Sequence, residues 1–203
     1  NGAGRIDAAR AATTRAIAYD TGAPERVSIS LAAGTVASAE TEAHTVAIQN
    51  LGAAPVTYDV ALEESLGMPG VTVQLDTDRV TAAPGETALA GVRFLLDPAM
   101  MTHPRDPAVI VTTEGLQRFW LSEVSGYVTF TPAGTDTPAL RLPYYGAPRP
   151  ASTLQATQRF LDGRSGAEAL SVTVSAENGR PDINFLNHFE LLGYDGNDPA
   201  SEG

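Results

Sequence analysis

RFWLSEVSGYVTFTPAGTDTPALRLPYYGAPRP, residues Arg118–Pro150, contains the most legible pair of strands in the sequence and its only tryptophan. Its residues alternate along the chain: Tyr127, Thr129 and Thr131 lie on one side, and Val128 and Phe130 lie on the other, which we expect to face the core. A Pro-Ala-Gly-Thr-Asp turn comes next, and residues 139–145 return. The pattern predicts a β-hairpin. Phe119 and Trp120, just upstream, supply aromatic surface for its centre, each able to bury roughly 150 to 250 Å².

The segments before this hairpin show the same strand-like pattern. Short apolar–polar alternations, separated by turn residues about every 8 to 12 positions, are typical of an all-β sandwich. The expected strands span residues 27–31, 44–48, 55–62, 71–75, 79–82 and 86–96. Between Asp97 and Leu116 three X-Pro pairs favour a loop, because the residue before proline avoids helical geometry. The sequence therefore predicts an antiparallel β-sandwich.

The two ends of the chain differ from this central part. The first 20 residues, NGAGRIDAARAATTRAIAYD, contain the alanine-rich run 8–12, which predicts about two turns of helix. So short a helix is marginal alone, so we expect it to belong to a neighbouring domain or to dock on one. GAPRP at residues 146–150 predicts a stiff linker, and strand-like runs come after it at 170–176 and 183–192.

Composition and charge restrict the partners. The chain has 203 residues with 13 basic and 24 acidic side chains, a net charge of −11, and no cysteine. Phosphate contacts need a positive surface, so we expect no nucleic-acid partner. The most apolar run, residues 88–101, is broken by Arg93 and Asp97, so we expect no membrane insertion. The chain begins without Met or a signal-peptide pattern, so we expect it to be a piece of something longer.

Three histidines, His44, His103 and His188, are the candidates for proton transfer near neutral pH. A hydrolase triad needs one of them hydrogen-bonded to a nucleophilic serine and an acidic partner. No Gly-x-Ser-x-Gly or comparable signature accompanies them, so we expect structural or surface roles. The sequence predicts no catalytic residue and no cofactor, and therefore no enzyme activity for this chain.

Several acidic residues are candidates for metal ligands or for an acid–base pair. Asp195–Asp198 lacks the spaced ligands of a calcium-binding loop, so we expect an acidic tail. Asp76 and Asp78 are expected to be turn residues that hydrogen-bond their own backbone. Glu63 and Glu64 are expected at a solvated strand end. We therefore predict no metal site.

The aromatic residues leave two interpretations open. Trp120, Tyr127, Tyr144 and Tyr145 could form a sugar-binding platform, which requires exposed coplanar rings. Aromatic residues within strands mostly fill interiors, so we favour core packing. A carbohydrate-binding or adhesive extracellular β-sandwich module remains the alternative function.

The N-terminal segment GAGRIDAARA, Gly2–Ala11, resembles the end of the catalytic domain in large bacterial subtilisin-like serine peptidases, where a Gly-x-Gly-x-(Val/Ile)-(Asn/Asp)-Ala-x-x-Ala segment forms the last helix. The chain after this segment resembles their fibronectin type III-like domain. The matching segments are QNLG at 49–52, PVTYDV at 55–60, GVTVQLDTDRVTAAPGET at 70–87 and the block at 119–150. The resemblance covers roughly residues 1 to 150, with a weaker match in HFELLGYDGN.

This resemblance implies a division of the chain into three parts. Residues 1–20 would be the tail of an upstream peptidase domain, 21–150 a fibronectin type III or immunoglobulin-like sandwich, and 151–203 an additional β segment or the start of a further domain. In the family the catalytic Asp, His and Ser and the oxyanion Asn lie upstream, so no residue here inherits those roles. The chain is expected to be a non-catalytic accessory domain of a secreted peptidase. It would stabilise or orient the catalytic domain, its partner in the same chain, and aid contact with protein substrate or a surface.

Overall fold

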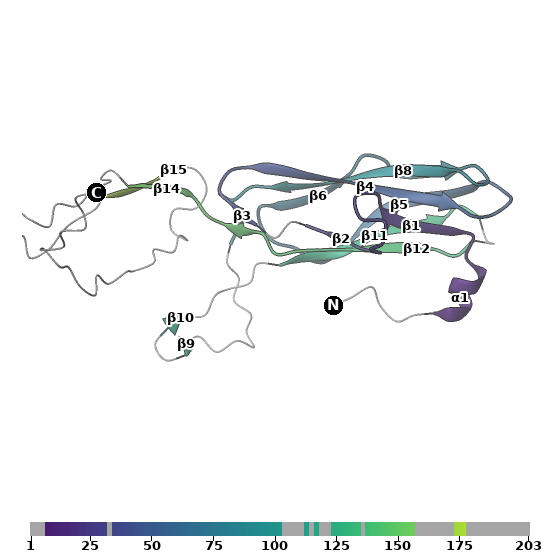
Figure 1. Cartoon of the computed structure of the whole chain (residues 1–203), viewed down its shortest axis with the longest axis horizontal. Coiled ribbons are helices and arrows are strands. Elements are labelled where there is room, and N and C mark those ends of the chain that lie inside the picture. The colour runs from purple at the N-terminus through teal and green to yellow at the C-terminus, as the bar shows by residue number, and fades with distance from the viewer. Residues whose placement is uncertain are drawn as a thin grey trace, which may run out of the picture.

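Strands dominate the residues that the computed structural model describes, which are 7–31, 34–102, 112–113, 116–117, 123–134, 137–156 and 173–177. Two sheets lie face to face in the central body (Figure 1). The first contains, in spatial order, β1 (Ala16–Asp20), β4 (Glu40–Asn50), β8 (Thr87–Leu96) and β6 (Val71–Leu75), all antiparallel.

The second sheet contains the predicted hairpin at its centre. Its order is β2 (Ile29–Ser30), β12 (Leu140–Gly146), β11 (Val124–Pro132), β5 (Val56–Leu66) and β7 (Arg79–Ala82). The pairs are antiparallel except that β2 runs parallel to β12. The segment Ala16–Ser30 thus contributes one strand to each sheet. The predicted antiparallel β-sandwich is confirmed.

The alternation predicted for β11 is also confirmed. Val128 and Phe130 are fully buried, whereas Tyr127 and Thr129 are half-buried and Thr131 is exposed on the outer side. Phe119 and Trp120, expected at the centre of the fold, lie outside the described residues.

Other aromatic side chains fill the described core. Phe94 of β8 meets Tyr144 of β12 edge to face, with ring centroids 5.5 Å apart, so this pair joins the two sheets. Tyr58 and Phe130 form a second such pair at 6.3 Å. Edge-to-face pairs are worth about 0.5 to 1.5 kcal/mol beyond the area they bury. All four rings are almost completely buried.

Smaller elements lie outside the two sheets. The helix α1 (Ala8–Thr13) confirms the predicted helix and is capped by the Asp7 side chain, which accepts from the amide of Arg10 at 3.0 Å. Short pairs join β3 (Thr35–Val36) to β13 (Arg149–Pro150), β9 (Thr112–Thr113) to β10 (Leu116–Gln117), and β14 (Thr153–Ala156) to β15 (Val174–Glu177). In the described part of the chain, no helix has the length and hydropathy of a membrane span.

Three segments differ from expectation. Val27 is 63% exposed, because regular pairing of the expected strand starts only at Ile29. Residues 16–20, expected in the N-terminal tail, form β1 and pair with β4 along their whole length. The expected linker at 146–150 is hydrogen-bonded at its end, since β13 pairs with β3 and the Ala151 amide donates to the Val36 carbonyl. The expected strand at 183–192 lies outside the described residues.

Candidate functional site

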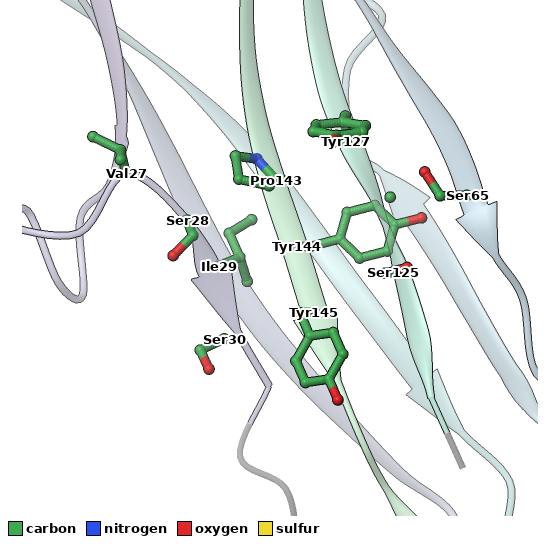
Figure 2. Close-up of a pocket in the computed structure, with 11 residues that line it drawn as sticks. Val27, Ser28, Ile29, Ser30, Ser65, Ser125, Tyr127, Pro143, Tyr144 and Tyr145 are labelled. Atoms are coloured by element: carbon green, nitrogen blue, oxygen red, sulfur yellow. The ribbon is translucent and has the colours of Figure 1, made fainter. Parts of the chain in front are cut away.

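A hollow of about 590 Å³ lies on the second sheet, across β2, β12, β11 and the end of β5 (Figure 2). A register shift between β11 and β5 lies at its border. Ser125 of β11 pairs with Leu66, whereas the next residue, Gly126, pairs with Glu64, so Ser65 is an extra residue in β5. Such a bulge bends its strand and redirects side chains. The extra residue, Ser65, is one of the residues that line the hollow.

Two tyrosines with solvent-accessible rings belong to the hollow. Tyr127 of β11 is directly opposite Pro143 of β12, and Tyr145 is opposite Ser125, so Tyr127 and Tyr145 share one face of the hairpin. Tyr145 is 41% exposed and its hydroxyl donates to Glu123 at 3.1 Å. Burial, with a smaller effect of this bond to Glu123, raises the pKa of the Tyr145 phenol.

The Tyr127 ring is in contact with an arginine. The Cζ atom of Arg141 lies 4.9 Å from its centroid, a cation–π distance, and Arg141 is not part of the hollow. In Figure 2 the Tyr127 ring is seen edge-on at one end of the hollow and the Tyr145 ring is seen more openly at the other. The two rings do not make one flat platform.

Tyr144 contributes to the floor of the hollow but belongs to the core. Its side chain is 2% exposed, and the Phe94 ring covers it from the opposite sheet. Burial first, and the charge of Glu64 second, raise the pKa of its phenol. Core packing, the interpretation favoured from the sequence, holds for Tyr144. Because Tyr144 is buried, the four residues do not together form the platform considered as the alternative, and Trp120 lies outside the described residues.

The polar residues in the rest of the lining are neutral, and they lie among apolar residues and a glycine. Four serines line the hollow: Ser28, Ser30, Ser65 and Ser125. Each hydroxyl can both donate and accept a hydrogen bond. No charged side chain is among the lining residues. These serines were not predicted from the sequence, because they come from three separate segments and carry no shared motif.

His44 lies elsewhere, on β4, between two carboxylates. Its Nδ1 is 2.8 Å from Oδ2 of Asp20 at the end of β1, and its Nε2 is 2.9 Å from Oε1 of Glu42. Both ring nitrogens therefore face acids, and its ring also meets Phe94 edge to face. The contacts show a structural role that ties β1 to β4. His103 and His188 lie outside the described residues.

The acidic candidates fall at separate places. Asp76 bonds across the sheet, with Oδ1 accepting from the Gly91 amide at 2.7 Å, where we expected a bond to its own turn. Glu63 and Glu64 are in β5 at the bulge, before the strand ends at Leu66. Asp195–Asp198 lies outside the described residues. Among the residues with described positions, no group of His, Asp and Glu side chains is arranged to hold a metal ion.

Comparison with known proteins assigns this chain to no family. No family model matches the chain, and no curated protein matches it in sequence. Among solved structures, the secreted serine protease VesC from Vibrio cholerae is 10% identical with a TM-score of 0.37, over 61% of this chain and 22% of that one. A FixG-related protein from Vibrio parahaemolyticus is 10% identical with a TM-score of 0.34, over 66% and 94%. The Escherichia coli alpha-2-macroglobulin is 16% identical with a TM-score of 0.38, over 70% and 10%.

The chain thus spans a small fraction of the protease and of the macroglobulin. TM-scores below 0.5 at such identities define neither a family nor an activity. By its fold, the chain is a β-sandwich protein with an N-terminal helix.

Proposed function

We propose that this chain is a non-catalytic accessory β-sandwich of a secreted subtilisin-like serine endopeptidase. Its partner is the catalytic domain upstream in the same polypeptide, which it stabilises and orients, and it aids contact with protein substrate or a surface. One observation carries the proposal: the segment Gly2–Ala11, which leads into α1 and includes its first residues, resembles the last helix of that catalytic domain.

The helix has no buried residue within the described structure. Its four alanines are exposed, and a recess of about 740 Å³ separates it from β1 and from the turn between β11 and β12. A helix of six residues gains too few hydrogen bonds to be stable alone. A packed neighbour on its alanine face would supply the missing stabilisation, and the upstream domain is the neighbour we propose.

The junction between α1 and the sandwich is short and bonded. The Thr14 hydroxyl donates to the Ala16 carbonyl at 2.8 Å, and the Leu51 amide donates to the Arg15 carbonyl at 2.7 Å. A domain attached through α1 would therefore be held at a restricted angle. In Figure 1, α1 and the antiparallel β14–β15 pair lie at opposite ends of the sandwich, an arrangement that suits a spacer between flanking segments.

The chemistry of the described residues agrees with a supporting role. A triad histidine must bond to a nucleophilic hydroxyl through one nitrogen and to an acid through the other. Both nitrogens of His44 are bonded to acids. The proposal therefore assigns hydrolysis to the upstream domain.

Two measurements test this function. The coding sequence upstream of Asn1 should contain the Asp, His and Ser of a subtilisin-like triad, and its absence would remove the peptidase assignment. The purified 203-residue chain should take up no fluorophosphonate probe under conditions that label trypsin. Labelling of any serine in this chain would contradict a non-catalytic role.

A further inference from the structure

We propose that the hollow formed by Tyr127, Tyr145 and the four serines binds a neutral carbohydrate. This site is independent of the upstream domain, because every lining residue belongs to the sandwich. It also differs from the flat platform considered from the sequence, since Tyr144 is in the core and Trp120 is not among the lining residues.

The two aromatic rings supply the apolar part of the site. Sugar rings present C–H faces that pack against aromatic surfaces. The contact with Arg141 fixes the Tyr127 ring, and the bond to Glu123 fixes the Tyr145 ring. Rings that are already held lose little side-chain entropy when a ligand binds, which favours affinity.

The serines supply the polar part. Ser28 and Ser30 line one side of the hollow, and Ser65 and Ser125 line the other (Figure 2). A ligand rich in hydroxyls matches groups that donate and accept. A volume of about 590 Å³ is within the usual range for small-ligand sites, roughly 300 to 1,000 Å³.

Charge decides between kinds of carbohydrate. The lining contains no charged side chain. Arg141 lies on the Tyr127 ring, but Glu123 and Glu64 lie next to Tyr145 and Tyr144, and the whole chain carries a net charge of −11. Uronic-acid or sulfated polymers would be repelled by this field. The short strand β2, at the edge of the sheet, pairs through only two residues, which offers little backbone for an added peptide strand. A neutral glycan is the ligand that fits best.

Affinity electrophoresis of the 203-residue chain tests the proposal, with gels containing starch, mannan, soluble cellulose or soluble chitin derivatives, polygalacturonate, or casein. Retardation is expected with at least one neutral polysaccharide. Tyr145→Ala and Tyr127→Ala should each weaken it about tenfold, equivalent to about 1.4 kcal/mol. Tyr145→Phe, which keeps the ring, should retain most of the binding.

Leu89→Ala is the matched control, because Leu89 is an exposed apolar residue, 58% accessible, on β8 of the other sheet. It should leave retardation unchanged, and circular dichroism should confirm that all variants fold. Absence of retardation by every neutral polymer, retardation only by polygalacturonate or casein, or binding that survives both tyrosine-to-alanine changes would each overturn the proposal.

Discussion

The ring of Tyr144 lies over Gly126, its direct partner across the β11–β12 pair. A methyl group at Gly126 would overlap the Tyr144 hydroxyl and the Glu63 carbonyl. The missing side chain thus makes room for a buried aromatic ring, next to the bulge that lies at the border of the hollow. A glycine in a strand destabilises the sheet less when an aromatic ring on the neighbouring strand covers it.

Gly126→Ala should therefore destabilise the sandwich, although alanine is otherwise the better strand residue. Overpacking of this kind costs about 1 to 3 kcal/mol, which we expect in urea denaturation. Gly134→Ala is the control, because a Cβ there meets no atom within 4 Å. Equal stability of the Gly126 variant and the parent chain would show that the ring can move aside.

The buried side chain of Asn50, at the end of β4, connects two turns of the sandwich. The side chain is fully buried; its Nδ2 donates to the carbonyls of Ala54, Ala82 and Ala83 at 2.9 to 3.1 Å, and its Oδ1 accepts from the Gly52 amide at 2.9 Å. These bonds tie the turn after β4 to the turn after β7.

Asn50→Asp keeps the size of this side chain and replaces its donor by an acceptor facing three carbonyl oxygens. The free energy of unfolding should fall by about 3 kcal/mol or more, because each unsatisfied buried polar group costs roughly 1 to 3 kcal/mol. Gln74→Glu, the same change of group at an exposed position of β6, should stay within about 0.5 kcal/mol in the same denaturation experiment. A similar small effect at both positions would contradict the assigned role of Asn50.

His44→Ala should loosen β1 from β4. The change removes the bonds of His44 to Asp20 and Glu42, and the nearly buried Asp20 carboxylate keeps its bond from the Gly22 amide but loses the one from the imidazole. Hydrogen bonds to charged groups contribute about 1.5 to 3 kcal/mol, so the loss should be of that order. Hydrogen exchange of the β1 amides should become faster than in the parent chain.

Arg79→Ala provides the comparison for His44. It breaks an ion pair with Asp59 in which both side chains are more than half exposed, and such surface pairs are worth about 0 to 1 kcal/mol. Equal losses of stability in His44→Ala and Arg79→Ala would contradict the proposed role of His44 in tying β1 to β4. Hydrogen exchange of the β1 amides at the parent rate in His44→Ala would contradict it as well.

Local sequence patterns were enough to predict many of the strands of this fold. The bounds of β6 and β7 agree with those predicted, because turn residues border both strands and their side chains alternate. Alternation also places the neighbours Tyr144 and Tyr145 on opposite faces, a signal that already separates the core tyrosine from the one in the hollow. Gly126 inside a strand pattern was a further signal of a close approach.

Tertiary contacts account for what sequence reasoning missed. Three features depend on contacts between positions distant in the chain. They are the parallel pairing of β2 with β12, the register shift that makes Ser65 an extra residue, and the bond between Asp20 and His44. No local period encodes such contacts. The serines of the hollow depend on them, because their convergence is set by which strands become neighbours.

Alkaline pH should destabilise the sandwich through its buried tyrosines. Burial raises the pKa of Tyr58 and of Tyr144 above the ordinary value of 10.0, so each phenol binds its proton more tightly in the folded chain than in the unfolded chain. A raised folded-state pKa contributes stability that is complete below about pH 10 and is lost as the pH rises through the folded-state pKa. Tyr144→Phe removes one of these groups, so base-induced unfolding followed by circular dichroism should move to higher pH. Tyr145→Phe, at an exposed ring, should move it less, and an unchanged midpoint for Tyr144→Phe would show that this phenol does not govern alkaline unfolding.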